Sequence, residues 1–414
     1  MSHRAPTEQD HDLVESIGER IDWSVAASIG KRLSRPGPKI TAYTRDAAYA
    51  ELLDAATRAE APVREVTGLA DGLRIPTTRV LDRDEWVDAA ARSMQSMLGL
   101  DASPSPVASL PVEARTSSVG VPPSSVEVRG ALATSLETPH HNDAAQQGLT
   151  AIPGKLWRTS ISNLEKVPAT VGGAQAGTLL AFLSSAILGQ YDPFTPDPDT
   201  GEPGVLMVVA PNIISVERAL KVVPSDFRLW VCLHEVTHRV QFSANPWLRQ
   251  YMTDNIELLT SDAGESTSEV VTRITAALRS DKPREKGVIG AMQLLQSPEQ
   301  YEAFTRMMML GTLLEGHADH VMDAVGPAHV PTVAAIRKAF DGKRAARQSP
   351  LQRIFRALIG MDAKMAQYVR GKAFVDEVVG TVGMERFNAI WTSPETMPLP
   401  EEISEPKKWI ERVL

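Results

Sequence analysis

Apolar positions in this chain of 414 residues recur mostly at helical spacing. Such patterns predict helices over residues 12–33, 45–60, 84–98, 168–188, 352–370 and 372–379. One short continuous apolar run, residues 205–210, lies between Pro-Gly and Pro-Asn pairs and predicts a buried strand. The pattern therefore predicts a mainly α fold with a small β-sheet, of the α+β class.

Two further helices have clear boundaries. Residues 226–243 follow Pro224-Ser225-Asp226, which predicts an N-cap serine and an acid in the first turn, and they end before Asn245-Pro246. Their apolar side chains are spread around nearly the whole circumference, so we expect this helix to be buried on most sides. Residues 298–325 begin at a capping box and end before Gly326-Pro327, which predicts one long helix.

Residues 101–148 interrupt these patterns. They are rich in Ala, Ser, Pro, Val and Thr without a period, a composition that cannot bury enough surface to fold alone. We interpret them as a flexible linker or insertion between an N-terminal helical region, residues 1–100, and a catalytic domain, residues 149–414.

Charge and composition narrow the class of protein. The chain carries 43 basic and 51 acidic residues, a net charge of −8, without a basic run, which argues against nucleic acid binding. No apolar leader segment or membrane-spanning run is recognisable, so we expect a cytoplasmic enzyme that does not contact the membrane. The single cysteine, Cys232, excludes an internal disulfide. The oligomeric state is not indicated by the sequence.

The sequence His-Glu-Val-Thr-His at residues 234–238 lies inside the first of the two bounded helices. Residues at i and i+4 lie about 40° apart around a helix and roughly 6 Å along it, so His234 and His238 can bind one ion, preferably zinc. Glu235 is about 100° from His234 and can reach a water on that metal as its general base. The alternative is a pair of core histidines with Glu235 in an ion pair.

A third ligand is expected from the second bounded helix. Glu315 and Asp319 share one face at i and i+4, flanked by Gly311 and Ala318, whose small size predicts close approach of another helix. We predict Glu315 as the third ligand. We predict Asp319 as the acceptor of the far N–H group of a ligand histidine, which would fix its tautomer.

His317 is the alternative third ligand, because a later histidine completes another known zinc pattern. It lies about 200° from Glu315 on the helical wheel, so both cannot face one ion. If Glu315 binds the metal, His317 is left to support the ligands from behind. For the developing oxyanion, Tyr368 is the candidate donor, with His317 or Arg239 as alternatives.

Three segments carry a family resemblance: VVAPNIISVERAL at 208–220, FRLWVCLHEVTHRVQF at 227–242 and LLEGHADHVMD at 313–323. They resemble the bacterial zincin-like metallopeptidases type 2, a gluzincin-like family often labelled as associated with deazaflavin coenzyme biosynthesis. The resemblance implies a zincin-like catalytic domain, Zn²⁺ as cofactor and a peptide or protein substrate. One departure is the separation of His238 from Glu315, 315 minus 238 or 77 residues, which is longer than in compact gluzincins.

The function expected is hydrolysis of peptide bonds by a metal-bound water, with Glu235 as general base. An exposed strand edge would pair with the substrate backbone, and the strand at 205–210 or a neighbour would supply it. Two other classes remain open. One is a zinc protein that keeps the ion for stability or partner binding, and the other is a metal-dependent hydrolase of a small molecule.

Overall fold

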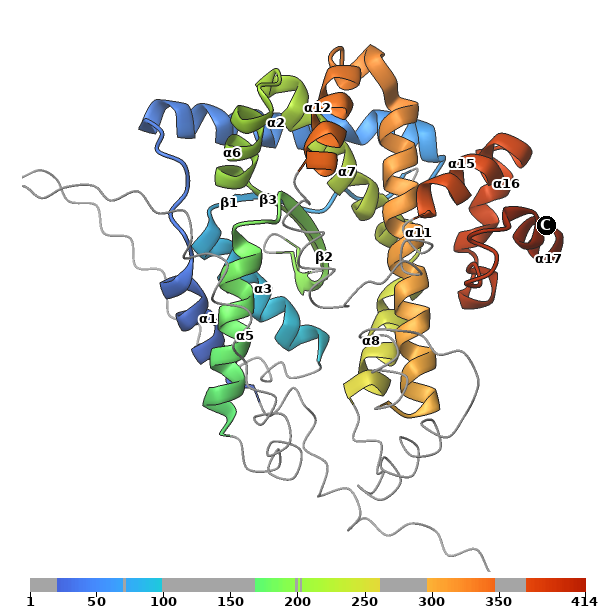
Figure 1. Cartoon of the computed structure of the whole chain (residues 1–414), viewed down its shortest axis with the longest axis horizontal. Helices are drawn as coiled ribbons and strands as arrows, with labels where there is room; N and C mark the ends of the chain where they lie inside the picture. The colour runs from blue at the N-terminus through green and yellow to red at the C-terminus, as the bar shows by residue number, and fades with distance from the viewer. Residues whose placement is uncertain are drawn as a thin grey trace, which may run out of the picture. The chain divides into compact units, whose positions relative to one another are not determined.

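The computed structural model describes residues 21–69, 72–98, 168–197, 200–201, 203–260, 296–346 and 370–414. Within them the protein is mostly helical with one three-stranded sheet, which confirms the predicted α+β class (Figure 1). None of the described helices is long and apolar enough to cross a membrane. The segment predicted as a linker, Tyr368 and most of the helix predicted at 352–370 lie outside the described residues.

The sheet consists of β1 (Thr78–Leu81), β2 (Gly189–Pro196) and β3 (Pro203–Val209), in the order β1-β3-β2. The central strand, β3, is the one that the apolar run predicts. It pairs in parallel with β1 and antiparallel with β2. The helix predicted at 168–188 ends at Ser184, and the chain then continues into β2, which the sequence pattern did not predict.

Both faces of β3 are buried, in two different cores. Leu206 and Val208 belong to the larger core, whereas Val205, Met207 and Val209 belong to the smaller one. Helices α2 (Ala42–Thr67) and α7 (Pro224–Ala244) contribute to the larger core. Because helices cover both faces, the strand has a continuous apolar sequence instead of an alternating one.

The smaller core is formed by three helices that lie together on one side of the sheet (Figure 1). They are α1 (Trp23–Leu33), α3 (Arg83–Met97) and α5 (Ala169–Ser184). A side chain at Gly177 of α5 would place its Cβ 2.5 Å from the carbonyl oxygen of Ala26 in α1. The glycine therefore permits the close backbone approach expected from its small size.

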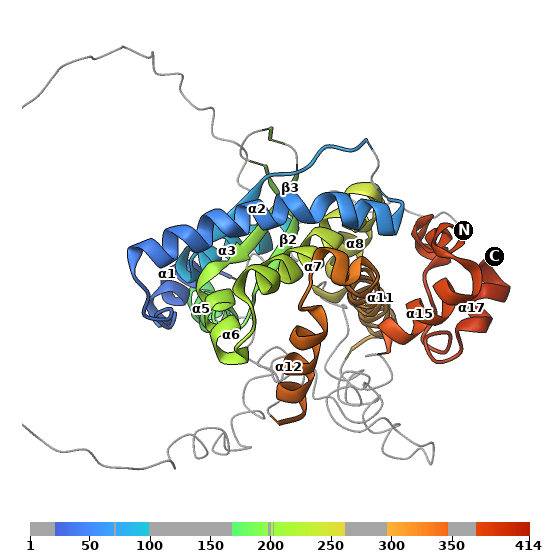
Figure 2. The same cartoon turned by 90° about the horizontal axis from the view of Figure 1, so that it is seen from above.

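Helix α7 matches the predicted helix 226–243 closely and is buried along most of its length. Its N-cap is Val223 and no side chain caps it, so the prediction of an N-cap serine was wrong. The acid of the first turn has another role, since the Asp226 carboxylate accepts hydrogen bonds from the backbone N–H and hydroxyl of Thr332. These bonds tie α7 to the residue preceding α12 (Val333–Ala346). Figure 2 shows α2 lying across α7.

Helix α11 (Pro298–His329) begins at the predicted capping box, formed by Ser297 and Gln300. Its regular part ends at Gly326, where φ is 64°. The helix packs against α7, α8 (Trp247–Thr260) and α15 (Gly371–Val382). A Cβ at Gly316 would overlap with the carbonyl group of Gly371, so the closest approach of another helix is at Gly316, between the predicted Gly311 and Ala318, and a Cβ at Gly311 meets no described atom within 4 Å.

The remaining described elements are short. Helix α6 (Ala210–Leu220) connects β3 to α7. At the C-terminal end lie α16 (Met384–Phe387), two 3-10 helices (Asn388–Trp391 and Pro394–Thr396) and α17 (Pro406–Val413). Phe387, Trp391 and Trp409 from this end belong to the larger core, which also contains α7 and α11. The C-terminal elements therefore support the two helices that carry the predicted ligands.

Candidate metal centre

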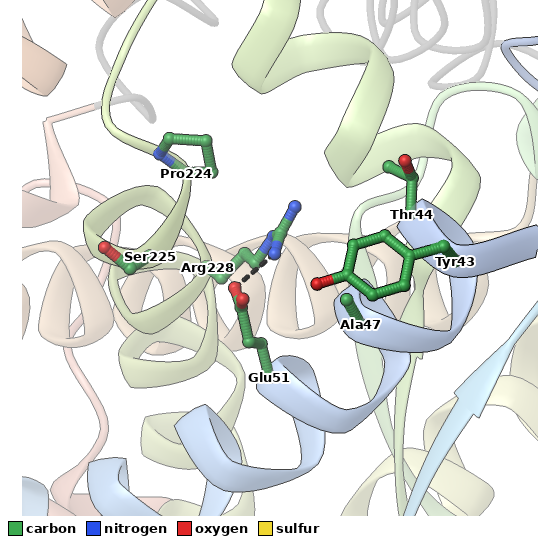
Figure 3. A pocket seen from close by; sticks show the side chains of 7 residues that line it. All are labelled: Tyr43, Thr44, Ala47, Glu51, Pro224, Ser225 and Arg228. Carbon is green, nitrogen blue, oxygen red and sulfur yellow. Dashed lines mark hydrogen bonds and ion pairs between the residues drawn. The ribbon is translucent and has the colours of Figure 1, made fainter. Parts of the chain in front are cut away.

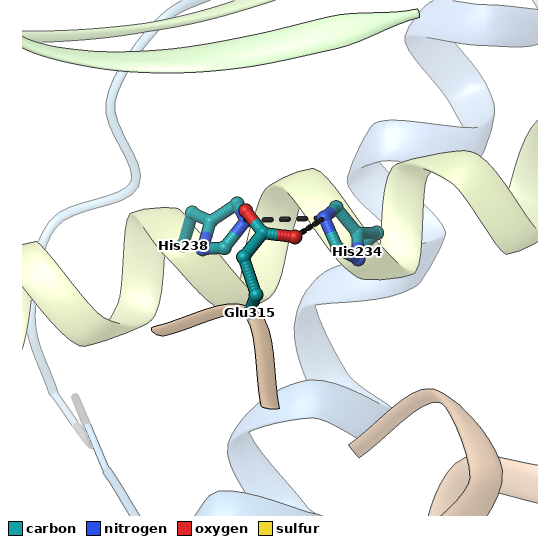
Figure 4. A group of neighbouring side chains, drawn as sticks. All are labelled: His234, His238 and Glu315. Carbon is teal, nitrogen blue, oxygen red and sulfur yellow. Dashed lines mark hydrogen bonds and ion pairs between the residues drawn. The ribbon is translucent and has the colours of Figure 1, made fainter. Parts of the chain in front are cut away.

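The side chains of His234, His238 and Glu315 meet where α11 packs against α7 (Figure 4). The Nε2 atoms of the two histidines are 3.1 Å apart. Glu315 places Oε2 3.5 Å from Nε2 of His234 and Oε1 3.4 Å from Nε2 of His238. Of the two candidates for the third ligand, the structure thus brings Glu315 to the histidine pair.

This donor triangle has the dimensions of a zinc site. Zn–N and Zn–O bonds of about 2.0–2.2 Å in tetrahedral geometry place neighbouring donor atoms about 3.3–3.6 Å apart. The distances of 3.1, 3.5 and 3.4 Å between the donor atoms are close to these values. Two imidazoles and one carboxylate are also the donor set of a catalytic zinc site that keeps one position for water. The residues present therefore fit the metal.

The cluster is closed on the histidine side and open on the glutamate side. The side chains of His234 and His238 are 23% and 12% exposed, whereas that of Glu315 is 67% exposed. Glu315 is therefore the most solvent-accessible of the three ligands.

The charges of the cluster compensate one another. Burial lowers the pKa of His234, but the hydrogen bond and the charge of Glu315 outweigh this effect and raise it to about 9. Loss of hydration beside the two rings raises the pKa of Glu315, but the hydrogen bond and the charge of His234 hold it well below its ordinary value. Glu315 is consequently an ionised ligand. A metal ion must displace the proton that His234 binds below about pH 9.

Glu235 lies next to the ligands but points to the sheet. Glu235 is only 6% exposed. Burial raises its pKa, and the neighbouring histidines offset part of this effect. A carboxyl group with a raised pKa, on the residue directly after a metal ligand, is suited to accept and return a proton.

Each ligand histidine has a partner behind it that the sequence analysis missed. Nδ1 of His238 hydrogen-bonds to Oε1 of Gln241 at 2.9 Å, and Nδ1 of His234 lies 3.3 Å from the sulfur of Met322. Gln241 follows His238 by three residues on the same helix, so helical spacing alone was a usable signal. Met322 comes from α11, and nothing near the histidine motif points to it.

Asp319 does not have the role predicted for it. Its carboxylate accepts a hydrogen bond from Arg337 of α12 at 3.2 Å, and Met322 takes the place at His234. A guanidinium is the stronger partner for a carboxylate, because its N–H groups carry a full charge. Asp319 still lies near enough for its charge to contribute to the raised pKa of His234.

The other predicted residues lie away from the open side of the cluster. His317 is fully buried and packs against Phe387 and Trp391, with ring centroids 5.6 and 5.3 Å away. Arg239 is buried in an ion pair with Glu60 of α2. Neither is therefore placed to donate to an oxyanion. The role predicted for Tyr368 stays a prediction, because Tyr368 lies outside the described residues.

A pocket of about 390 Å³ opens elsewhere, between α2 and the start of α7 (Figure 3). Its lining includes Tyr43, Glu51 and Arg228. The guanidinium of Arg228 forms ion pairs with Glu51 and with Glu217, so its charge is neutralised. None of the three predicted metal ligands lines this pocket, and we assign it no role in the chemistry.

Comparison with known proteins agrees with the geometry. A crystal structure described as that of "a putative hydrolase with a novel fold from Chloroflexus aurantiacus" is similar over 95% of this chain and 98% of that chain, with 26% identity and a TM-score of 0.55. No curated protein matches the chain. A family model described as zincin-like metallopeptidase matches residues 21–410. Because that match spans nearly the whole sequence and includes the donor cluster, this chain belongs to the zincin-like metallopeptidase family.

Proposed function

We propose that this protein is a zinc-dependent peptidase in which His234, His238 and Glu315 hold the metal. The observation that carries the proposal is the donor triangle, whose edges of 3.1 to 3.5 Å suit tetrahedral zinc. A buried glutamate with a raised pKa stands beside it. Membership of the family implies a hydrolase with a metal, typically zinc. That the metal is zinc and that the substrate is a peptide are our proposals.

Zinc, when bound, supplies a Lewis acid that polarises a carbonyl and makes water more acidic. Glu235 accepts the proton of the attacking water and passes it to the leaving amine. Its carboxyl group is held between α7 and the first residue of β2, because Gly189 has no side chain to displace it. The fixed position lets the same group serve in both proton transfers.

An extended peptide fits the sheet beside this base. Within the described sheet, β2 has a neighbouring strand on one side only, and we propose that the other side of its first residues, Gly189 to Asp192, pairs with a peptide backbone. The strand predicted for this purpose, β3, lies between two others and cannot pair further. Of the two neighbours of β3, we propose that β2 supplies the edge, because its first residue, Gly189, contacts Glu235. Peptides or proteins are accordingly the substrates that we propose, rather than nucleic acid.

The cytoplasm is the compartment that we propose for the reaction. The single cysteine, Cys232, is fully buried in the larger core, where it packs as a small apolar side chain. A chain with one cysteine forms no internal disulfide, as is usual in a reducing compartment.

The test compares wild type with Glu235→Gln in zinc content and in cleavage of a peptide pool. We expect the variant to keep its zinc and to lose activity by about 10²- to 10⁴-fold, because only the proton acceptor is removed. Glu257→Gln is the matched control. Glu257 is an exposed glutamate on α8, and its variant should cleave like wild type.

Three results would overturn the proposal. Equal turnover by Glu235→Gln would remove this residue from the chemistry. Cleavage of small amides but not of peptides would indicate a small-molecule hydrolase. Zinc binding without any cleavage, together with unfolding on chelation, would indicate a structural metal.

A further inference from the structure

Gln241 connects one metal ligand to a buried histidine behind the site. The glutamine is fully buried on α7, one turn after His238. Oε1 of Gln241 hydrogen-bonds to Nδ1 of His238 at 2.9 Å, and its Nε2 lies 3.0 Å from the carbonyl oxygen of Leu314 and 3.0 Å from Nδ1 of His317. The chain of contacts thus runs from α7 to α11 and ends in the C-terminal part of the core.

The carbonyl of Leu314 determines which way the amide of Gln241 faces. A backbone carbonyl only accepts hydrogen bonds, so the group beside it must be the NH₂ of the glutamine. Oε1 then faces His238 and accepts from Nδ1–H. A histidine protonated on Nδ1 keeps the lone pair of Nε2, which is the atom directed at His234 and Glu315.

His317 receives the second N–H of the same amide. Its Nδ1 accepts from Nε2 of Gln241, while its ring is held between Phe387, at an interplanar angle of 19°, and Trp391. In the observed orientation, both N–H groups of the Gln241 amide have acceptors. A flipped amide would instead place its oxygen against the carbonyl of Leu314 and its NH₂ against Nδ1–H of His238, and neither contact is a hydrogen bond. The buried histidine therefore stabilises one orientation of the glutamine.

The two ligand histidines are supported unequally. Among the residues that the structure describes, the partner of Nδ1 of His234 is the thioether of Met322, and a thioether is a weak acceptor. His238 has a primary amide that is itself fixed by two acceptors. The ring orientation and tautomer of His238 are therefore fixed more firmly than those of His234, and they depend on Gln241.

We propose that Gln241 is a positioning residue of the metal centre, which holds His238 in the tautomer that presents Nε2, and that His317 acts through Gln241. The proposal rests on the zinc site of the proposed function but does not depend on the substrate. His317, the alternative candidate for the third ligand, is fully buried and does not bind the metal in this proposal. It contacts Gln241, which in turn contacts the ligand His238.

The experiment measures zinc affinity by competition with a chelator. Gln241→Leu keeps the size of the side chain and removes the hydrogen bonds, and we expect affinity to fall by about 10- to 100-fold, as for other residues that support a ligand histidine. Gln241→Glu keeps an acceptor for Nδ1–H of His238, and we expect it to bind zinc more tightly than Gln241→Leu. A purely structural role predicts the opposite order, because the glutamate would bury a charge opposite the carbonyl of Leu314.

A double variant tests whether His317 acts through the glutamine. His317→Leu alone should weaken zinc binding less than Gln241→Leu does. In the Gln241→Leu background it should have no further effect, since the contact is already lost. Asn255→Leu is the matched control, because this buried amide hydrogen-bonds within α8 and to Arg306 of α11, and its loss should leave zinc affinity unchanged.

Three results would overturn the proposal: Gln241→Leu within about twofold of wild type in zinc affinity, Gln241→Glu weaker than Gln241→Leu, or additive losses in the double variant. If Gln241→Leu does not fold, Gln241→Asn replaces it, since its amide is one methylene shorter. Wild type that binds zinc but cleaves no peptide would remove the proposed peptidase and leave this inference standing. Wild type that binds no zinc would remove both.

Discussion

A Cβ atom at Gly189 would lie 2.6 Å from Cγ of Glu235, so the first residue of β2 and the proposed base are in direct contact. Any side chain at this position must displace either the strand or the glutamate. The strand edge proposed for substrate binding and the group proposed for proton transfer are therefore positioned by one contact. Glycine is required here because the side chain of Glu235 occupies the space that a Cβ atom would need.

Gly189→Ala should reduce peptide turnover while the protein keeps its zinc. The added methyl group moves Glu235 or β2 by a fraction of an ångström to about an ångström, and a shift of that size costs on the order of 10²-fold in rate. Turnover and zinc content of the purified variant are the measurements. Gly380→Ala in α15 is the control, because a Cβ there meets no described atom within 4 Å. Full turnover by Gly189→Ala would show that this contact does not position the base.

Glu315→Ala and His317→Ala should separate the two candidates for the third ligand. Removing Glu315 deletes a donor at 3.4–3.5 Å from both imidazoles, so we expect a loss of zinc affinity beyond the roughly 10- to 100-fold typical of a supporting residue. His317→Ala should mainly lower thermal stability, since it leaves a cavity beside Phe387 and Trp391. Metal analysis of both variants beside wild type measures the difference. Near-normal zinc in Glu315→Ala would reverse the assignment.

The metal-free protein should lose stability as the pH rises through about 9. Folding raises the pKa of His234 from 6.5 to about 9, so its contribution is fully present below about pH 6.5 and disappears as the proton leaves. Glu315 has a lowered pKa, so its contribution is present above about pH 4.5 and is lost only in stronger acid. The interaction between His234 and Glu315 therefore contributes most to the stability of the metal-free protein between about pH 4.5 and pH 6.5.

Thermal midpoints between pH 5 and 10, with a chelator present, measure this effect. Glu315→Gln should remove most of the alkaline decline, because the carboxylate that raises the pKa of His234 is gone. Zinc-loaded protein should lack the decline as well, since the metal displaces the proton. An equal decline in Glu315→Gln would assign the effect to another group.

The chemistry of the site could be predicted from the sequence where it depends on the geometry of a single helix. The spacing of His234 and His238 places both on one face, and the helical wheel shows that Glu315 and His317 cannot share one ion. Gln241 was within reach of the same argument, being three residues after His238. Each of these inferences uses only local periodicity.

The features that the sequence did not predict depend on tertiary packing. β2 contains Gly189, Pro193 and Pro196, which weaken a strand pattern but are tolerated at a sheet edge. The pairing of Asp319 with Arg337 requires α12 to fold back on α11, and a helical wheel cannot show this. Likewise, the contact of Met322 with His234 depends on how two distant helices cross.

Gly316 fixes the distance between α11 and α15 immediately after the third ligand. A Cβ at this glycine would overlap with the carbonyl group of Gly371, so Gly316→Ala must push the two helices apart. We expect a loss of stability of about 1–3 kcal/mol, as for other overpacked sites. We also expect weaker zinc binding, because Glu315 moves with its helix. Thermal denaturation and chelator competition measure the two effects.

Gly311→Ala is the matched control on the same helix. A Cβ at Gly311 meets no described atom within 4 Å. Alanine is the better helix former, so this variant should gain about 0.5–1 kcal/mol in stability and bind zinc as wild type does. If Gly316→Ala behaved like Gly311→Ala, the packing of α15 would not determine the position of Glu315, and the support of the metal centre would have to come from α7 and α8 instead.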